Sequence, residues 1–198
     1  MTTTSLRERN RARTRLEIET AALELMEQHG YQATTVDEIA RRAGVSSATF
    51  FRYFPAKEDV LFATEHSAAD RMVELVAARP DPAHTLDALS APVTAYADEM
   101  LADAVSQTHR LTRLVMTTPE LAGRSMRMRL RWETGIARQF AREAGVEEPG
   151  FEHVLVANLA VSCLAAALWQ WQRGDSPSSI ASDTRRAFAA AGALSTHP

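Results

Sequence analysis

The stretch that decides the fold covers residues 34–54 and reads TTVDEIARRAGVSSATFFRYF. Thr35 and Glu38 have the spacing of a capping box, in which a hydroxyl and a carboxylate satisfy the free amides at a helix start. Apolar residues then recur at helical spacing until Gly44, which suits the left-handed residue that ends many helices. Ser46 can cap a second helix immediately afterwards. The stretch therefore predicts two short helices joined by a tight turn.

The second of these helices has two kinds of face. Phe50 and Phe54 lie four residues apart and are expected to point into a core. Small polar, aromatic and cationic side chains remain on the other faces, and a short helix of this kind suits the major groove of DNA. The guanidinium group of Arg52 can reach either a base edge or a phosphate. The candidate DNA contacts on this helix are Ser46, Ser47, Thr49, Phe51, Arg52 and Tyr53.

The same region carries a family resemblance. The motifs are Gly30-Tyr31, Thr34-Thr35-Val36, Ile39-Ala40, Ala43-Gly44-Val45-Ser46, Thr49-Phe50-Phe51-Arg52-Tyr53-Phe54 and Lys57-Glu58. With them, residues 10–62 resemble the N-terminal domain of the TetR family of transcriptional regulators. The run Thr118-Pro119-Glu120-Leu121 with Arg124 and the late Trp169 resembles an actinobacterial subgroup of the family, whose corresponding helix also reads Thr-Phe-Phe-Arg-Tyr-Phe. The resemblance implies that Thr35 and Lys57, which stand at helix starts, contact DNA phosphates.

The chain departs from the family pattern at three positions. Ala48 stands where the family often has Gly, Phe51 where it often has Tyr, and Ala56 where it often has Ser. Phe51 lacks a hydroxyl that could bond a phosphate, and Ala56 lacks a side chain that could cap a helix. These departures bear on the phosphate contacts and not on the fold.

The charge distribution is compatible with DNA binding although the net charge of the 198 residues is −3. Residues 1–15 contain five arginines and a single glutamate, and local positive charge is what phosphates attract. This basic N-terminal arm is either a solvated tail or a contact to phosphates or the minor groove. Abundant Ala and Leu favour an all-helical chain.

The remaining bulk features favour a cytoplasmic protein without a membrane segment. Cys163 is the single cysteine and cannot form an internal disulfide. It is expected to be a small buried apolar residue. No N-terminal apolar stretch resembles a signal peptide. The uncharged apolar run 154–169 is shorter than the roughly 18–20 residues of a membrane span.

The rest of the chain predicts further helices separated by Pro and Gly. Together with the pair in 34–54, the expected helices cover 9–29, about 55–79, 85–106, 109–117, 119–143, 151–173 and 178–194. Pro92 lies early within one of them. We expect an all-α fold of about nine helices. A three-helix helix-turn-helix DNA-binding domain with the basic arm would cover 1–57, and a larger helical effector-binding and dimerisation domain would cover 58–198.

The second domain holds the candidate effector site. The helix 119–143 is rich in Met, aromatic residues and Arg. Its apolar residues are core by default, but the resemblance implies that some line a ligand pocket. Its arginines 124, 127, 129 and 131 form either a solvated face or a contact to an acidic effector. The effector would be a small, mostly apolar molecule, or an acyl-thioester of coenzyme A. The candidate pocket residues are Met116, Met128, Trp132 and Ile136.

The resemblance also implies a homodimer held by a four-helix bundle of the last two helices from each chain. The sequence supports this assignment, because an apolar and small-residue stripe recurs at helical spacing along the helix 151–173. Its members are Leu155, Leu159, Ser162, Ala166 and Trp169.

Three functions stay open at this point. The first is a regulator, expected to be a repressor, that a small-molecule effector releases from a palindromic operator in double-stranded DNA. The second is a constitutive DNA-binding protein without an effector, and the third an all-α carrier or enzyme. We find no His-Glu-x-x-His pattern, Gly-rich phosphate loop or nucleophile elbow. We therefore expect no metal site, no cofactor and no catalytic residue.

Overall fold

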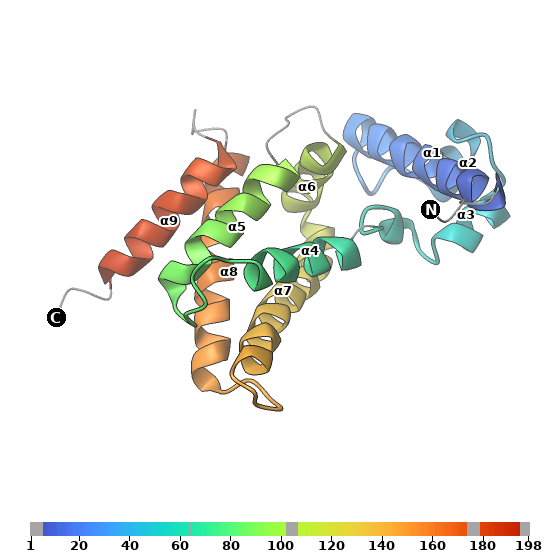
Figure 1. The fold of residues 1–198 in the computed structure, drawn as a ribbon. Helices are drawn as coiled ribbons and strands as arrows, with labels where there is room; N and C mark the ends of the chain where they lie inside the picture. Colours follow the sequence, from blue (N-terminus) through green and yellow to red (C-terminus); the bar gives the residue numbers. More distant parts are fainter. Residues whose placement is uncertain (1–5, 64, 102–106, 174–178, 195–198) are drawn as a thin grey trace. The chain divides into compact units, whose positions relative to one another are not determined.

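The computed structural model describes residues 6–63, 65–101, 107–173 and 179–194. Over these ranges the chain is all-helical, with nine α-helices and two 3₁₀ helices (Figure 1). The all-α fold predicted from the sequence is confirmed. The chain divides into two compact units. The first comprises Met1–Ala63 with Arg110–Leu121, and the second Thr64–His109 with Ala122–Pro198.

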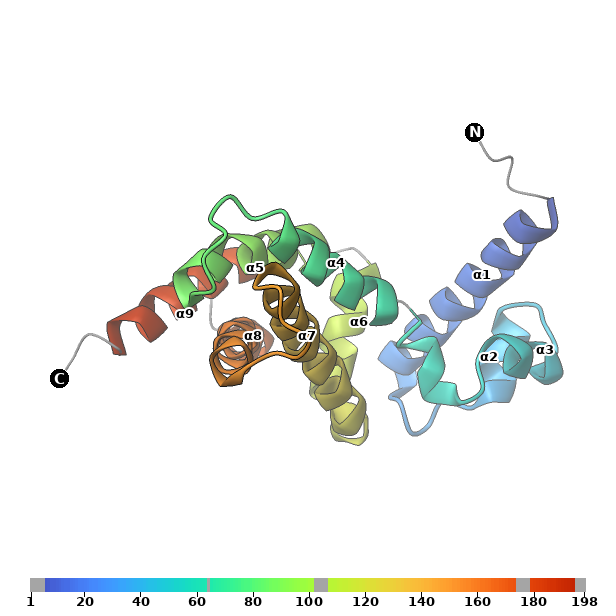
Figure 2. The ribbon, with the colours of Figure 1, turned by 60° about the horizontal axis from the view of Figure 1, so that its bottom comes forward.

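The first unit is built around a long helix and a short helical pair. Its elements are α1 (Leu6–His29), α2 (Val36–Arg42), α3 (Ser47–Tyr53) and the 3₁₀ helices η1 (Lys57–Val60) and η2 (Pro119–Leu121). Helix α1 packs against α2, which packs against α3 (Figure 2). The centre of this unit is fully buried and apolar, with Ile18, Leu23, Met26, Ile39 and Phe50. α1 begins before Arg9, so the arginines of the basic arm from Arg7 onward lie on a helix and not on a loose tail.

The expectation of one helix from about residue 55 to 79 is wrong. The chain instead forms η1, then a turn, and α4 begins only at Glu65. The Asp59 carboxylate accepts a hydrogen bond from the Ala56 amide at 2.9 Å and so caps a short, tight turn. The amides of Leu61 and Phe62 continue its three-residue hydrogen-bond spacing. Leu61 and Phe62 are thereby buried.

In its described residues, the second unit is a bundle of five helices. These are α4 (Glu65–Ala77), α5 (Leu86–Leu101), α7 (Ala122–Glu143), α8 (Phe151–Gln172) and α9 (Ile180–Leu194). α7 packs on α4 and α8, and α5 packs on α8 and α9. α6 (Gln107–Thr117) contains the boundary between the units. Pro92 lies inside α5 as expected. The last residues of the predicted helix 85–106, from 102 on, and residue 178 lie outside the described residues.

Gly135 sets a close approach between α7 and α4. A Cβ atom at this position would lie 2.7 Å from Cγ2 of Val73, whereas a Cβ at Gly123 of the same helix would meet nothing within 4 Å. Val is β-branched and cannot easily rotate away. Glycine at position 135 is therefore required by the packing of α4 on α7.

Gly135→Ala should destabilise the second unit, by about 1–3 kcal/mol, because the added methyl group overpacks the contact with Val73. Gly123→Ala is the matched control and should be neutral or stabilising by up to about 1 kcal/mol, since alanine favours a helix. Urea denaturation of both variants measures the difference. Equal stabilities would show that α4 and α7 do not approach as closely as described.

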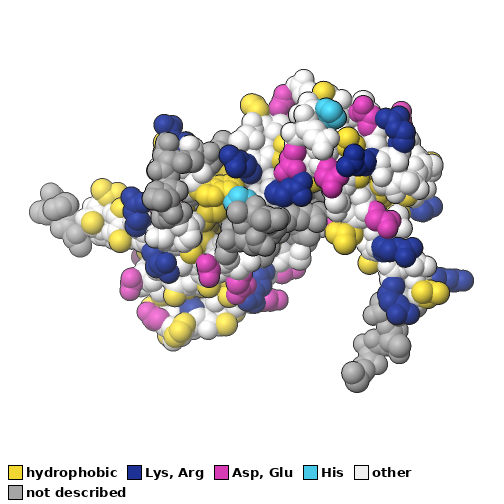
Figure 3. All heavy atoms as spheres, turned by 90° about the horizontal axis from the view of Figure 1, so that it is seen from above, with side chains coloured by type: hydrophobic (Ala, Val, Ile, Leu, Met, Phe, Trp, Pro, Cys, Tyr) yellow, Lys and Arg dark blue, Asp and Glu magenta, His cyan; other side chains and the backbone are white. Residues whose placement is uncertain are grey.

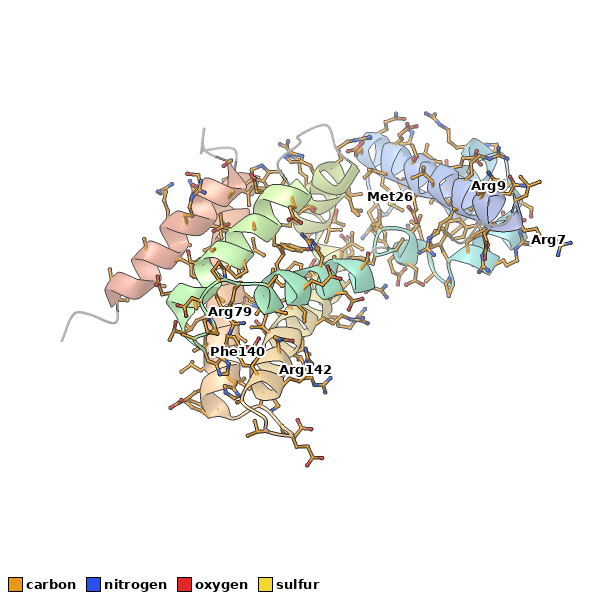
Figure 4. All side chains as sticks on the ribbon, in the orientation of Figure 1. Arg7, Arg9, Met26, Arg79, Phe140 and Arg142 are labelled. Carbon is orange, nitrogen blue, oxygen red and sulfur yellow. The ribbon has the colours of Figure 1, made fainter. Side chains whose placement is uncertain are left out.

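A buried ion pair joins the end of α4 to the end of α7. The Arg79 side chain is 1% exposed and donates to both carboxylate oxygens of Glu143, at 3.0 and 2.7 Å. It also donates to the carbonyls of Val76 and Pro82, each at 2.8 Å, and lies over the ring of Phe140 (Figure 4). The pKa of Glu143 is lowered to about 2, and the hydrogen bonds from Arg79 are the largest cause.

The stability contributed by Glu143 should depend on pH. A carboxyl group whose pKa is lowered by folding stabilises the protein above its unfolded pKa, and this contribution disappears as pH falls towards the folded value. Glu143→Gln should therefore lower the free energy of unfolding by roughly 2–3 kcal/mol at pH 7. The difference from the unsubstituted protein should shrink between about pH 5 and pH 2. Urea titrations across this range measure it, and a difference independent of pH would contradict the assignment.

Candidate DNA-binding site and effector region

The α2–turn–α3 segment has the geometry predicted from its sequence. Thr35 caps α2 in a reciprocal capping box with Glu38: the Glu38 amide donates to the Thr35 hydroxyl, and the Thr35 amide donates to the carboxylate. These bonds hold the pKa of Glu38 below its usual value. Gly44 has φ +68°, the left-handed conformation that only glycine adopts cheaply. The Ser46 hydroxyl then caps α3 by accepting from the Thr49 amide at 3.1 Å.

Helix α3 is anchored by aromatic rings on one face and presents its opposite face to solvent. Phe50 and Phe54 are 0% and 1% exposed, with ring centroids 5.6 Å apart. Phe51, by contrast, is 52% exposed and packs its ring edge-to-face on Phe50. Ala48 and Arg52 are exposed beside it. α3 is thus a short rigid helix with a free outer face, as a recognition helix requires.

The hydroxyl groups at the site differ in whether their protons are already used in a hydrogen bond. Thr35, Ser46 and Ser47 already donate their hydroxyl protons to Glu38, Thr49 and Asp37, at 2.8, 2.9 and 2.5 Å. A phosphate has only acceptor oxygens, so these three hydroxyls must turn before they can bond one. Within the described residues, no hydrogen bond uses the hydroxyl proton of Thr49 or Tyr53.

The ammonium group of Lys57 is used in contacts within the protein. It donates to the carbonyls of Tyr31 and Thr34, at 2.7 and 2.9 Å, and lies 4.2 Å from the centroid of the Tyr31 ring. It therefore fixes the loop that leads into the Thr35 cap of α2. The sequence pattern placed Lys57 at a helix start, but nothing in it indicated these contacts across more than twenty residues.

A hollow of about 460 Å³ lies between the N-terminal half of α1 and the C-terminal end of α3. Figure 4 shows Arg7 and Arg9 at this end of α1. Figure 3 shows Lys and Arg side chains in dark blue, interspersed with Asp and Glu in magenta, on one face of the molecule. The residues that line the hollow are Arg7, Asn10, Arg11, Thr14, Arg52 and Tyr53. We call it the arginine hollow. It brings part of the basic arm next to two of the predicted DNA contacts, an arrangement that the sequence pattern did not indicate.

The four candidate effector residues come from both units. Met116 lies on α6 in the first unit, whereas Met128, Trp132 and Ile136 lie on α7 in the second. Ile136 is fully buried. Trp132 packs edge-to-face on Tyr96 with ring centroids 5.5 Å apart. Burial raises the pKa of the Tyr96 hydroxyl. None of the four lines the arginine hollow.

Two buried polar atoms stand out on α7. Trp132 Nε1 and Ser125 Oγ have no hydrogen-bond partner within the described part of the chain. They are seven residues apart and so lie on the same face of the helix. Arg129, which the sequence left as a solvated residue or an effector contact, instead donates to Glu133 and to Ser162 of α8, each at 2.7 Å.

The predicted dimer stripe on α8 is accessible. Leu155, Leu159 and Trp169 are 44%, 42% and 56% exposed, and Ala166 is exposed between them. The expectation that the apolar run of this helix is too short for a membrane span is wrong by length and composition alone, because residues 151–171 of α8 are long and apolar enough to cross a membrane. Cys163, on another face of the helix, is buried as expected, and burial raises the pKa of its thiol. In the described ranges, no three His, Cys, Asp or Glu side chains are grouped as a metal site.

Comparisons with known proteins agree with this geometry. Residues 18–64 match the family model of bacterial regulatory proteins of the tetR family, and residues 83–194 match that of the MftR C-terminal domain. The chain is 30% identical over 173 residues to a protein of Mycobacterium tuberculosis whose name, MftR, assigns it to transcriptional regulation of mycofactocin biosynthesis. That match covers 86% of this chain and 85% of the relative.

Solved structures share the fold at low sequence identity. The SmeT–triclosan complex superposes with a TM-score of 0.68 at 18% identity, covering 91% of this chain and 90% of SmeT. FadR of Bacillus subtilis in complex with stearoyl-CoA gives a TM-score of 0.60 at 18% identity, covering 88% and 95%.

The fold and the exposed α3 define a helix-turn-helix protein that binds DNA. The chain belongs to the TetR family of transcriptional regulators, with an MftR-type C-terminal domain. The matched families and relatives are transcriptional regulators and not enzymes, so the enzyme alternative is set aside.

Proposed function

We propose that the protein is a homodimeric repressor that binds a palindromic operator and is released from it by a small, mostly apolar effector. The observation that carries DNA binding is the outer face of α3, where Thr49, Arg52 and Tyr53 keep donors that no hydrogen bond of the described residues uses. Hydrogen-bond donors on a capped helix, whose opposite face is anchored by buried aromatic rings, suit base edges and phosphates. The proposed DNA contacts remain Thr35, Ser46, Ser47, Thr49, Phe51, Arg52, Tyr53 and Lys57.

The exposed stripe on α8 supports the dimer. An isolated helix face with Leu155, Leu159 and Trp169 in water is unfavourable, and a second copy would cover it. Polar Asn158 and Ser162 on the same helix, and its packing on α7 and α9, favour a protein interface over a membrane span. The two DNA-binding domains of one dimer would read two half-sites about 34–36 Å apart. We place the protein in the cytoplasm, where its operator would be.

Two observations support the effector. Trp132 Nε1 and Ser125 Oγ are buried without protein partners, and a ligand with one hydrogen-bond acceptor could satisfy either of them. Fold neighbours have been solved with triclosan and with stearoyl-CoA, which combine apolar bulk with polar ends. Met128, Trp132 and Ile136 are the proposed wall residues, with Met116 as a further candidate.

A gel-shift series tests DNA binding. The full-length protein is titrated onto the region upstream of its own gene and onto unrelated DNA of equal length, at several salt concentrations. We expect preference for the upstream region and a steep loss of affinity with salt, because each neutralised phosphate releases a counterion. Equal binding to both DNAs, or no salt dependence, would contradict the proposal.

Triclosan and stearoyl-CoA are the first probes for the effector site. If a ligand lowers the affinity of the protein for the operator, the operator must lower the affinity for that ligand by the same factor. We expect a coupling free energy of about 1–3 kcal/mol. Trp132→Phe, which removes the Nε1 donor but keeps the ring, should reduce the affinity for a ligand that bonds it. If no tested apolar ligand alters operator affinity, the constitutive DNA-binding protein becomes the better description.

A further inference from the structure

The arginine hollow collects positive charge from two helices. Arg7 and Arg11 are four residues apart on α1, so they lie on one face of that helix. Arg52 approaches from α3, with its guanidinium carbon 5.6 Å from the centroid of the Tyr53 ring. None of the six lining residues is acidic. Guanidinium groups stay protonated at any physiological pH, so the three charges are permanent.

Within the described residues, the three arginines of the hollow make no ion pair, as is also true of Arg9, whereas other arginines of the first unit do. Elsewhere in the first unit, Arg13 pairs with Glu17, Arg15 with Glu19, and Arg42 with Glu24. Three like charges around one hollow repel one another, and an anion placed among them would remove that cost. The arrangement therefore favours an anionic occupant.

The position of the hollow indicates which anion. Two of its lining residues, Arg52 and Tyr53, end the recognition helix, so an anion held there is adjacent to whatever α3 touches. DNA carries a phosphate charge for about every 1.7 Å of its axis, and arginine bonds phosphate oxygens in a planar, bidentate manner. Thr14 and Asn10 add neutral donors on the α1 side.

We propose that the arginine hollow binds a backbone phosphate of the operator, so that Arg7 and Arg11 are DNA contacts and Arg52 contacts phosphate and not a base. This inference rests on the proposed function, because it requires that α3 docks on DNA. It separates the basic arm into two sets. Arg7 and Arg11 form a defined site with α3, whereas Arg9 and Arg13 contribute only general positive charge.

The test compares two double variants of the full-length protein. An operator duplex is first selected from random sequence with the unsubstituted protein. Affinity for it is then measured by fluorescence anisotropy from low to moderate salt. Arg7→Ala with Arg11→Ala should weaken binding by about 10- to 100-fold and reduce the salt slope by about one for each DNA-binding domain, because each loses one phosphate contact. The control, Arg9→Ala with Arg13→Ala, removes the same charge from the same helix and should change the slope by less than one.

A neutral methylphosphonate, placed at each operator phosphate in turn, locates the contact. The unsubstituted protein should lose affinity at each phosphate that it contacts. At one of these phosphates in each half-site, the Arg7/Arg11 double variant should lose no further affinity. Arg52→Ala should weaken binding to all sequences of a half-site library about equally. Circular dichroism of each variant confirms folding, which these exposed positions should not disturb.

Several results would overturn the inference. Equal losses in the two double variants would mean that only the total charge of the arm matters. If Arg52→Ala relaxes the sequence preference at a single base pair, Arg52 contacts a base. If inorganic phosphate raises the thermal stability of the unsubstituted protein, but the Arg7/Arg11 variant binds operator normally, the hollow is a site for a free anion. Failure of the unsubstituted protein to select any DNA would instead contradict the proposed function itself.

Discussion

Ala166→Asp is expected to convert the protein to monomers, or to make it insoluble, and to abolish operator binding at concentrations that saturate the unsubstituted dimer. Ala166 lies between Leu159 and Trp169 on the exposed stripe of α8. In the proposed dimer the new carboxylate would be buried without a partner, which costs about 3–5 kcal/mol. The dimer dissociation constant should therefore rise by at least about 100-fold. Sedimentation velocity at micromolar concentration measures it.

Ala91→Asp is the matched control for this experiment. Ala91 is an exposed alanine in the interior of α5, away from the stripe, so the same change there should leave the dimer intact. If Ala166→Asp sediments as an intact dimer, the interface is not on this face of α8. Loss of the dimer in both variants would mean that the charge itself, and not its position, is responsible.

Lys57→Ala should weaken binding to all DNA sequences about equally, by at least tenfold, and also lower the stability of the first unit by about 2 kcal/mol. The stability loss follows because the ammonium group makes two hydrogen bonds to the loop carbonyls of Tyr31 and Thr34, and hydrogen bonds to a charged group contribute about 1.5–3 kcal/mol. Without them the loop no longer fixes the Thr35 cap. A half-site library and thermal denaturation measure the two effects.

Arg52→Ala provides the contrast. Its side chain is exposed and makes no ion pair with a described residue, so its removal should weaken DNA binding without changing the melting temperature. Lys57→Ala with unchanged stability would show that the contacts to Tyr31 and Thr34 contribute nothing, and Lys57 would then act on DNA alone. Selective loss at one base pair in Lys57→Ala would contradict its role in positioning α2.

Local sequence signals predicted what depends on local structure. The capping box of Thr35 and Glu38, the left-handed Gly44 and the cap at Ser46 all act within four residues, and each was found as expected. The α8 stripe was predicted for the same reason, because helical spacing determines which residues share a face. The buried Phe50 and Phe54 follow from the same rule.

The features that the sequence did not indicate all depend on distant contacts. Lys57 reaches carbonyls more than twenty residues earlier. Arg52 lines the same hollow as Arg7 and Arg11 because α1 passes the end of α3. The break between η1 and α4 arises because Leu61 and Phe62 are drawn into the core of the first unit, which overrides a helical pattern. Residues 110–121 belong to the first unit, where Arg110 pairs with Glu27 and the Gln32 amide donates to Glu120.

The most direct test of the central claim is a selection from duplexes of random sequence with the purified full-length protein, followed by footprinting of the enriched DNA. We predict an inverted repeat, bound by one dimer, with protection of two half-sites about one helical turn apart, or a multiple of it, on one face of the duplex. Enrichment of a single unrepeated site bound by a monomer, or of no sequence at all, would contradict the account.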